Sequence, residues 1–148
     1  MDANLELEAL RERAGSLGVV PRHICLSNDA VLRMASMDYA PFAGQQAATD
    51  YISINMVSAR TAPMMRRSSR GSLEGVVRPG TVLLNLPDDD ADVRWGACEM
   101  LALGIDHNAF AARLGLEIDA ARLVGAAARL HRDPLLTSVM RAIWHEGE

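Results

Sequence analysis

Apolar and polar positions alternate in short runs through the middle of the chain, from about residue 24 to residue 105. The runs are "AVLRMASMDY", "DYISINMVSA", "APMMRR", "LEGVVRP", "TVLLNL" and "VRWGACEMLAL". Proline, glycine, serine, asparagine and aspartate separate them at fairly regular spacing. Several short strands spaced in this way favour a compact antiparallel sandwich or barrel over alternating β-α units. We therefore predict an α+β fold in which a small antiparallel β-barrel is followed by helices.

The stretch "VVRPGTVLLNLPDDDADVRWGACEMLAL" gives clear local signals. Pro79-Gly80 predicts a tight turn, because proline presets the first central torsion and glycine accepts the positive φ of the second. Residues 81–86 are short, apolar and partly β-branched, which indicates a buried strand. Residues 93–105 alternate between two faces and are predicted to form a further strand.

The acidic residues between these two strands raise the question of a calcium site. Asp88, Asp90, Asp92 and Glu99 occupy positions one, three, five and twelve of an EF-hand loop. The sixth position, which needs glycine for its sharp bend, is Val93, and the flanks are predicted strands instead of helices. We therefore expect a solvated loop between two strands.

The hydrophobic period becomes helical from Asp106 onward. Asp106 is a candidate N-cap for a helix that Gly115 terminates. Asp133 is the cap of a second helix, which has Pro134 at its first position. Residues 117–131, between them, have good helix propensity, but their length also allows an extended return to the barrel.

We expect the whole chain to form one domain. Its 148 residues are 49% hydrophobic and 23% charged, which is enough material for a sizeable core. The expected parts are an N-terminal extension at 1–22, the β-barrel at 23–105 and a helical part at 106–148. An irregular leucine stripe in the first part predicts a short helix that ends near Gly15 or Gly18.

Net charge and cysteine content indicate the cellular compartment of the protein and the kinds of partner that it is expected to contact. The formal charge of −4 argues against a surface that neutralises DNA phosphates. Charged residues such as Glu6 and Arg11 exclude a signal peptide or a membrane span at the N-terminus. We expect a cytoplasmic protein without membrane contact, in which Cys25 and Cys98 are free thiols.

The sequence carries no recognisable catalytic motif. It lacks the Gly-x-Ser-x-Gly elbow, the phosphate-binding glycine loop and the dinucleotide fingerprint. The four histidines, His23, His107, His131 and His145, lack the short-range spacing of a metal site. We therefore expect no catalytic residues, no metal and no cofactor, and a protein that is not an enzyme.

Arginine and methionine both cluster in the strand-rich half. A solvated hairpin tip is favoured over an anion site for the arginine cluster. Its members are Arg60, Arg66, Arg67, Arg70 and Arg78. Most of the eight methionines also fall here. Flexible thioethers fill irregular cores as well as pockets, and core filling is the favoured interpretation.

The order of these features resembles the N-terminal regulatory domain of AraC-type bacterial transcription regulators. The resemblance runs from about Val31 to Glu146, and "RPGTVLLNLP" and "RDPLLTSVMRAIW" carry it most clearly. It implies a cupin-like β-barrel that senses a small-molecule effector, followed by helices that make homodimer contacts. It also implies that residues 117–131 are extended. The metal pattern of enzymatic cupins, paired histidines with a glutamate, is missing.

Strand and helix periodicity single out residues for these two implied roles. The barrel-facing candidates for ligand contact are Met34, Ile54, Met56, Leu83 and Trp95. The candidates for the dimer interface are Leu136, Val139, Met140 and Ile143. The same helical stripe would serve equally well to cover the barrel.

AraC-type regulators bind DNA through a module with two helix-turn-helix units, and none follows Glu148 in this sequence. We expect an excised sensor domain or a naturally short relative, which contacts DNA only through a helix-turn-helix domain that this chain lacks. Two alternatives stay open. One is a stand-alone cupin-like small-molecule-binding protein or enzyme, and the other is an interaction module with a solid barrel.

Overall fold

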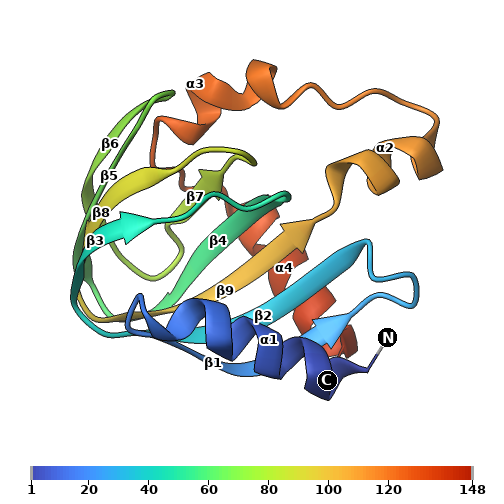
Figure 1. Ribbon diagram of the computed structural model, residues 1–148, viewed down its shortest axis with the longest axis horizontal. Coiled ribbons are helices and arrows are strands. Elements are labelled where there is room, and N and C mark those ends of the chain that lie inside the picture. Colours follow the sequence, from blue (N-terminus) through green and yellow to red (C-terminus); the bar gives the residue numbers. More distant parts are fainter. Residues whose placement is uncertain (1, 148) are drawn as a thin grey trace.

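The computed structural model describes residues 2–147, which form nine strands flanked by helices (Figure 1). Helix α1 (Ala3–Gly15) comes first. The strands are β1 (Val19–Leu26), β2 (Leu32–Tyr39), β3 (Phe42–Gln46), β4 (Ile52–Ala59), β5 (Ala62–Ser68), β6 (Gly71–Val77), β7 (Val82–Asn85), β8 (Ala91–Trp95) and β9 (Cys98–Ile105). The later helices are α2 (His107–Leu114), the 3-10 helix η1 (Ala120–Leu123), α3 (Val124–Ala127) and α4 (Pro134–Gly147).

The strands form two antiparallel sheets that face each other. The five-stranded sheet has the order β1-β2-β9-β4-β7, and the four-stranded sheet has the order β3-β8-β5-β6. The predicted α+β fold with antiparallel strands is therefore confirmed, but the predicted closed barrel is wrong. Strand β6 pairs with β5 and β7 pairs with β4, so the turn between β6 and β7 joins the sheets without pairing their edges. The container is an open sandwich.

The local turn and cap signals predict the structure well. Gly80 has φ of 88°, and the N–H of Thr81 donates to the carbonyl of Arg78 at 2.8 Å, as expected for the Pro79-Gly80 turn. Asp106 accepts from the N–H of Ala109 at 3.0 Å and so caps α2. Asp133 accepts from two N–H groups in the first turn of α4, at 2.9 and 3.0 Å. Such caps satisfy donors that a helix start leaves without partners.

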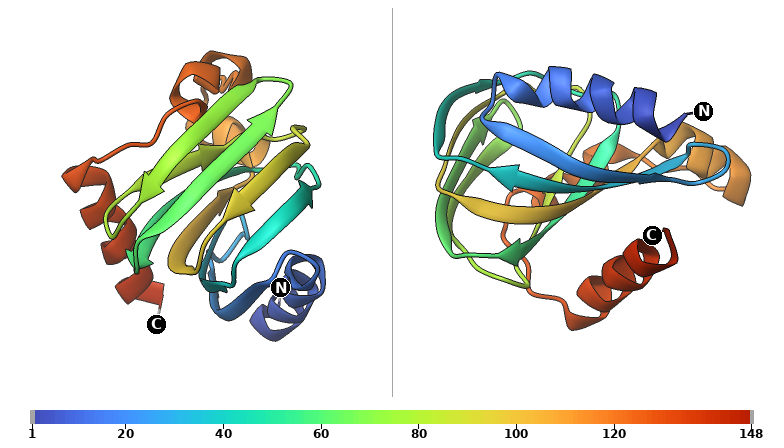
Figure 2. Two further views of the ribbon diagram at one scale, coloured as in Figure 1. Left: turned by 90° about the vertical axis from the view of Figure 1, so that its left-hand side faces the viewer. Right: turned by 90° about the horizontal axis from the view of Figure 1, so that it is seen from below.

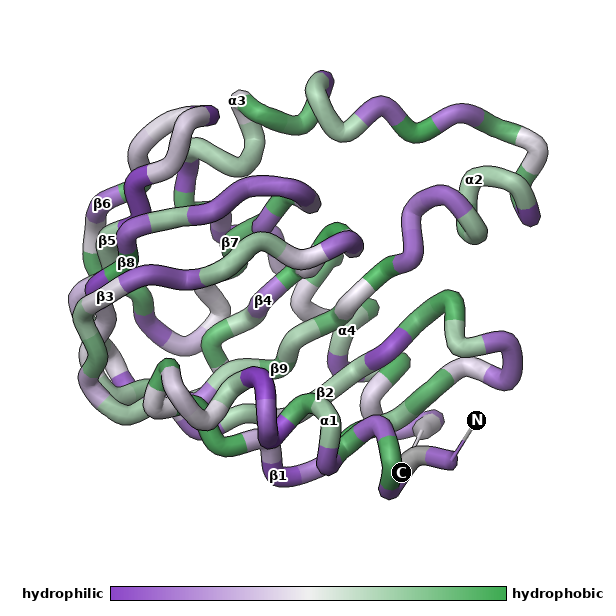
Figure 3. Tube along the Cα trace, in the orientation of Figure 1, coloured by the Kyte–Doolittle hydropathy of each residue, from purple (hydrophilic) through white to green (hydrophobic). Residues whose placement is uncertain are grey.

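The five-stranded sheet is covered on both faces. Its outer face packs against α4, whose axis runs across it (Figure 2). We call this contact the helix cluster; its buried members are Met34, Met56, Val82, Leu101, Leu103 and Met140. The inner face meets the four-stranded sheet, and α1 packs beside β1 (Figure 2). Unlike these covered faces, the turn between β5 and β6 consists of hydrophilic residues (Figure 3).

The segment 93–105, predicted as one strand, is two. Strand β8 ends at Trp95 and β9 begins at Cys98, so the chain turns at Gly96 and crosses from one sheet to the other. A Cβ atom at Gly96 would lie 2.8 Å from Pro63 Cδ and 3.1 Å from the Cβ of Ala62. Glycine is therefore required where this crossover passes β5, and the alternation on either side concealed the break.

Two further expectations need correction. Strand β1 begins at Val19, so the first sheet starts before residue 23. Residues 120–127 are helical, as η1 and α3, so the extended conformation that the resemblance implied for 117–131 is wrong there. Asp119 starts this segment by accepting from the N–H of Ala121 at 3.0 Å. The extended return comes later, where His131 forms a bridge with Val82.

Helix α1, predicted from the leucine stripe, ends at Gly15. Among residues 2–147, none of the helices combines the length and the apolar character that a membrane span requires.

The helix cluster makes a prediction for stability. Met140 is fully buried, whereas Leu114 on α2 is 53% exposed. Replacing Met140 by alanine should lower the free energy of unfolding by about 2–5 kcal/mol, because it leaves a cavity against the sheet. Leu114→Ala, the control, should change it by about 0.5 kcal/mol or less. Urea unfolding followed by circular dichroism measures both, and equal effects would contradict the packing described here.

Candidate functional site

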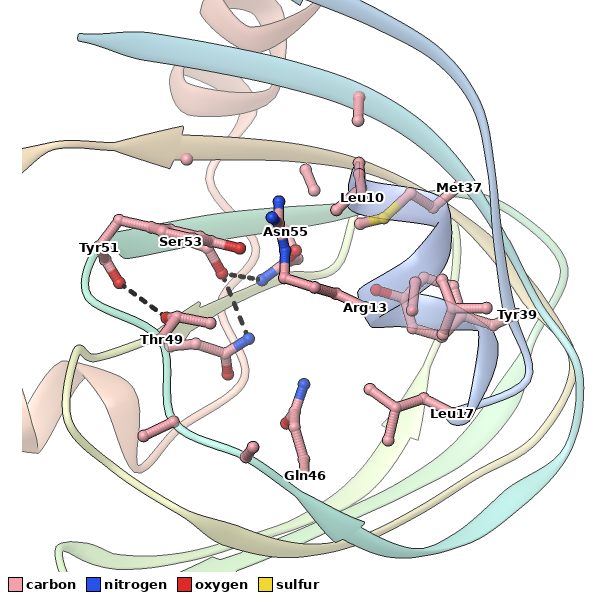
Figure 4. Close-up of a pocket in the computed structure, with 18 of the residues that line it drawn as sticks. Leu10, Arg13, Leu17, Met37, Tyr39, Gln46, Thr49, Tyr51, Ser53 and Asn55 are labelled. Atoms are coloured by element: carbon pink, nitrogen blue, oxygen red, sulfur yellow. Dashed lines mark hydrogen bonds between the residues drawn. The ribbon is translucent and has the colours of Figure 1, made fainter. Parts of the chain in front are cut away.

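A cavity of about 380 Å³ lies between the two sheets, beside α1 (Figure 4). Strands β2, β4, β7 and β9 of the five-stranded sheet contribute side chains to its wall, and so do α1, Trp95 of β8 and the segment after β3. The volume lies at the low end of the range for small-molecule sites. Exposed lining residues, such as Arg13 and Thr49, mark its mouth.

The cavity exists because small side chains occupy the middle of the inner face. Ala35 lies opposite Ala102 across β2 and β9, and Gly104 lies between Arg33 and Ser53. The neighbouring positions on the outer face hold large side chains, including Leu103 and Met34. Successive residues of a strand point to opposite faces, so the same strands build a dense outer face and a hollow inner one.

The wall on the β4 side is polar and connected by hydrogen bonds. Ser53 and Asn55 are buried, and Asn55 Nδ2 donates to Ser53 Oγ at 2.9 Å. Asn85 Nδ2 donates to the same oxygen at 3.3 Å (Figure 4). Because Ser53 Oγ accepts both bonds, its own hydrogen remains available for an acceptor in the cavity. Buried polar groups of this kind lower the stability of a protein unless they are hydrogen-bonded. The bonds among these three side chains therefore allow a polar wall inside the sandwich.

Arg66 joins this network to the helical part. Its guanidinium donates to Asn85 Oδ1, to the carbonyl of Leu84 at 3.0 Å and to the carbonyl of Ala127 in α3 at 2.6 Å. Burial lowers the pKa of Arg66, an effect that the charge of Asp89 opposes. The guanidinium nevertheless stays protonated, because the pKa of arginine lies far above neutrality. Arg66 is therefore a cation that ties β5, β7 and α3 together.

The opposite side of the cavity is apolar and aromatic. Leu17, Met37 and Tyr39 lie there (Figure 4). The rings of Tyr39 and Trp95 meet edge to face with centroids 5.3 Å apart, and Trp95 Nε1 donates to the carbonyl of Ala40 at 3.1 Å. Burial raises the pKa of Tyr39 well above its usual range, because it disfavours the charged phenolate. The cavity thus offers one polar wall and one apolar wall.

The predicted ligand-contact residues are mostly on the wrong face. Trp95 lines the cavity, and Leu83 is buried in the core between the sheets without lining it. Met34, Ile54 and Met56 instead belong to the helix cluster on the outer face. The prediction assigned the largest apolar residues to the interior, but α4 covers them, and the interior received the polar residues of the same strands.

The predicted dimer residues also lie mainly against the sheet. Leu136, Met140 and Ile143 pack in the helix cluster, so three of the four serve to cover the sandwich. Val139 is 45% exposed, and Leu135, four residues before it, is 75% exposed. The outward-facing apolar residues of α4 are therefore Leu135 and Val139.

The residues that the sequence interpretation missed are the polar ones. Ser53, Asn55 and Asn85 alternate with large apolar residues in "ISINM" and "LLN". Polar residues inside a strand that is buried on its other face are the signal that could have identified them, because they need partners or a cavity. Arg66, which the charge pattern predicts to lie on a solvated hairpin, is half-buried.

Metal ligands are not brought together in the described part of the chain. Residues 2–147 hold no group of three or more histidine, cysteine, aspartate or glutamate side chains close enough for an ion. His23 contacts Trp144, with ring centroids 6.1 Å apart, and His131 Nε2 lies 2.6 Å from the carbonyl oxygen of Ala126. His107 begins α2. None of these histidines lines the cavity.

Comparison with known proteins agrees with this architecture. No protein-family model matches the sequence, and no curated protein sequence matches it. The AraC-like transcriptional activator CuxR aligns with 93% of this chain and 55% of its own, with a TM-score of 0.64 and 12% identity. Oxalate decarboxylase from Bacillus subtilis aligns with 68% of this chain and 33% of its own, with a TM-score of 0.46 and 11% identity.

The similarity to CuxR is one of fold. It confirms, at the level of architecture, that this chain resembles part of an AraC-like transcriptional activator. The chain spans about half the length of CuxR and a third of the decarboxylase. At its lower TM-score, the decarboxylase adds no argument about this site.

Burial of the Cys98 thiol and the Tyr39 phenol leads us to predict a loss of stability at alkaline pH. Burial raises the pKa of the Cys98 thiol to about 11 from 9.0, with a smaller opposing effect of Arg60. The folded state therefore holds the thiol proton more tightly than the unfolded state, and this contribution is complete below pH 9 and lost as pH rises to 11. Tyr39 adds a loss of the same sign above its ordinary pKa of 10.0.

Urea unfolding between pH 8 and 11, under reducing conditions, tests this expectation. Cys98→Ala should be less stable at pH 8, because it leaves a small void, but its stability should fall less steeply with pH. Val77→Ala, which removes a buried apolar side chain from the same core, is the control: it should also lower the stability but keep the wild-type slope, since it removes no titrating group. Identical slopes in wild type and Cys98→Ala would contradict a buried, protonated thiol at position 98.

Proposed function

We propose that this chain is the effector-sensing and dimerisation domain of an AraC-type transcription regulator that acts in the cytoplasm. The observation that carries the proposal is the cavity of about 380 Å³ between the sheets, with a hydrogen-bonded polar wall inside an AraC-like regulatory fold. DNA recognition would belong to a helix-turn-helix module of the complete regulator. This chain alone, with a formal charge of −4, would not read DNA.

The domain is proposed to bind its effector without transforming it. Catalysis needs a nucleophile, an acid-base group or a metal positioned at the substrate. The histidines of the described chain lie outside the cavity lining, as given above. A binding role fits a cavity whose polar groups include hydroxyls, amides and guanidiniums, and whose two carboxylates, Glu6 and Asp89, lie beside arginines.

A route from the cavity to the C-terminal helix supports a regulatory role. Asn85 in the cavity wall accepts from Arg66, and Arg66 also donates to α3 at Ala127. The segment after α3 then bridges to β7 at His131 and Val82, and Asp133 caps α4 shortly afterwards. An effector that binds one arrangement of this hydrogen-bonded chain more tightly than another would shift the position of α4.

A cavity-filling variant tests the proposed sensing function. Ala102→Phe should fill the cavity, and Ala43→Phe, on an exposed position of β3, is the matched control. A metabolite at a hundredfold excess over its Kd should stabilise wild type and Ala43→Phe by about 2.7 kcal/mol, which raises Tm by several degrees. The same metabolite should leave Tm of Ala102→Phe unchanged.

Thermal-shift screening of a metabolite library with all three proteins gives this comparison. Compounds that shift all three equally bind elsewhere. If every stabilising compound behaves in that way, the cavity is not a sensor site.

Dimerisation is proposed to use the outward face of α4. Leu135 and Val139 are neighbours on that face, four residues apart, and both are substantially exposed. The double variant Leu135→Glu, Val139→Glu should sediment as a 16.0 kDa monomer, because charge at the centre of an apolar contact is not solvated. Arg141→Glu, at an exposed position of the same helix, should leave the dimer intact. A monomeric wild type in analytical ultracentrifugation would contradict this proposal.

A further inference from the structure

We propose that the cavity selects a small organic monocarboxylate, and that Arg13 of α1 holds its carboxylate group. The inference rests on the proposed function, because it names the chemical class of the effector for the same cavity.

The charged side chains that line the cavity do not cancel. Three arginines, Arg13, Arg33 and Arg66, stand against two carboxylates, Glu6 and Asp89. This leaves one excess positive charge among the side chains that line the cavity. The excess favours a ligand that carries one negative charge.

Two of the three arginines are already engaged. Arg33 pairs with Glu6 at 3.5 Å. Arg66 donates to three oxygen atoms of the protein and lies in the field of Asp89. Arg13 makes no hydrogen bond or ion pair with any residue between 2 and 147. The excess charge is therefore located on Arg13.

The side chain of Arg13 reaches from α1 into the cavity, toward Asn55 and the polar wall (Figure 4). A guanidinium presents its donors as a planar fork that matches the two oxygens of a carboxylate. The hydroxyl hydrogen of Ser53 is available in the same region, as described above. An anion entering at the mouth would thus meet a paired donor set that the protein itself leaves unused.

The rest of the ligand is defined by the other wall. Leu17, Met37 and Tyr39 offer apolar surface across from the polar wall (Figure 4). A compact apolar body attached to the carboxylate would cover these side chains and gain hydrophobic free energy. A phosphate monoester fits less well, because it carries between one and two negative charges near neutrality and Glu6 and Asp89 line the same cavity.

The test compares carboxylates with their neutral amides, which have nearly the same shape but no charge. Hexanoate, octanoate, benzoate and salicylate are titrated into the 148-residue protein beside their neutral amides, at constant ionic strength, with inorganic phosphate as a further anion. Isothermal titration calorimetry gives the Kd of each. At least one carboxylate should bind, its amide should bind about 10–100-fold more weakly, and phosphate should not bind, because a hydrogen-bonded charge is worth more than a neutral group.

Variants of α1 assign the effect to one side chain. Arg13→Met should weaken carboxylate binding about 10–100-fold while leaving the amide unchanged. Arg13→Lys, which keeps the charge without the fork, should be intermediate. Arg11→Met is the matched control on the same helix: Arg11 pairs with Glu8 and does not line the cavity, so this variant should bind as wild type. Circular dichroism and Tm establish that each variant is folded.

The outcomes separate this inference from the proposed function. If carboxylates and amides bind equally and Ala102→Phe abolishes both, the cavity is a binding site but the charge selection is overturned. Unchanged carboxylate binding in Arg13→Met, or an equal loss in Arg11→Met, also overturns it. If none of the carboxylates binds, or phosphate binds instead, the ligand class is wrong. The metabolite screen with Ala102→Phe then decides the sensing function independently.

Discussion

Burial of both faces of the five-stranded sheet is the constraint on which the rest of the structure depends. Each strand of that sheet has to supply one set of side chains to α4 and another to the interior. In β4, Ile54 and Met56 point to α4, while Ser53 and Asn55 point inward. The apolar set can be large because the helix covers it with Met140 and its neighbours. The inward set is free to be small and polar.

This separation of large apolar side chains on the outer face from small and polar ones on the inner face explains why the molecule can contain a cavity and still be stable. Stability of the sheet comes from two apolar regions, which are the helix cluster on its outer face and the core of buried residues between the two sheets. The part of the sheet that lines the cavity contributes little apolar packing, since the small residues Ala35, Ala102 and Gly104 lie in it. A site built in this way can be polar without weakening the fold, because its buried groups satisfy one another.

The charged groups around the cavity have different structural roles. Arg66 is part of the framework, since it connects β5, β7 and α3 through carbonyl and amide oxygens. Arg13 belongs to α1, which lies beside the sandwich. Its guanidinium has no hydrogen-bond or ion-pair partner among the described residues. A cation that the protein itself does not pair, next to unused donors, is the feature that gives the cavity a chemical preference.

The elements that depend on local chemistry could be predicted from the amino-acid sequence. The turn at Pro79-Gly80, the caps at Asp106 and Asp133 and the antiparallel class follow from torsional preference, capping and alternation, which are properties of a few adjacent residues. The face of each strand that lies in the interior depends on tertiary packing. Alternation predicts which residues share a face, but it does not predict which element covers that face. Tertiary packing also produces the break at Gly96, the helical form of 120–127 and the presence of Arg13, Ser53 and Asn55 in the lining of one cavity. These outcomes depend on which segments far apart in the chain come together, as Gly96 and Pro63 do, or α1 and β4 around the cavity, and no local pattern records them.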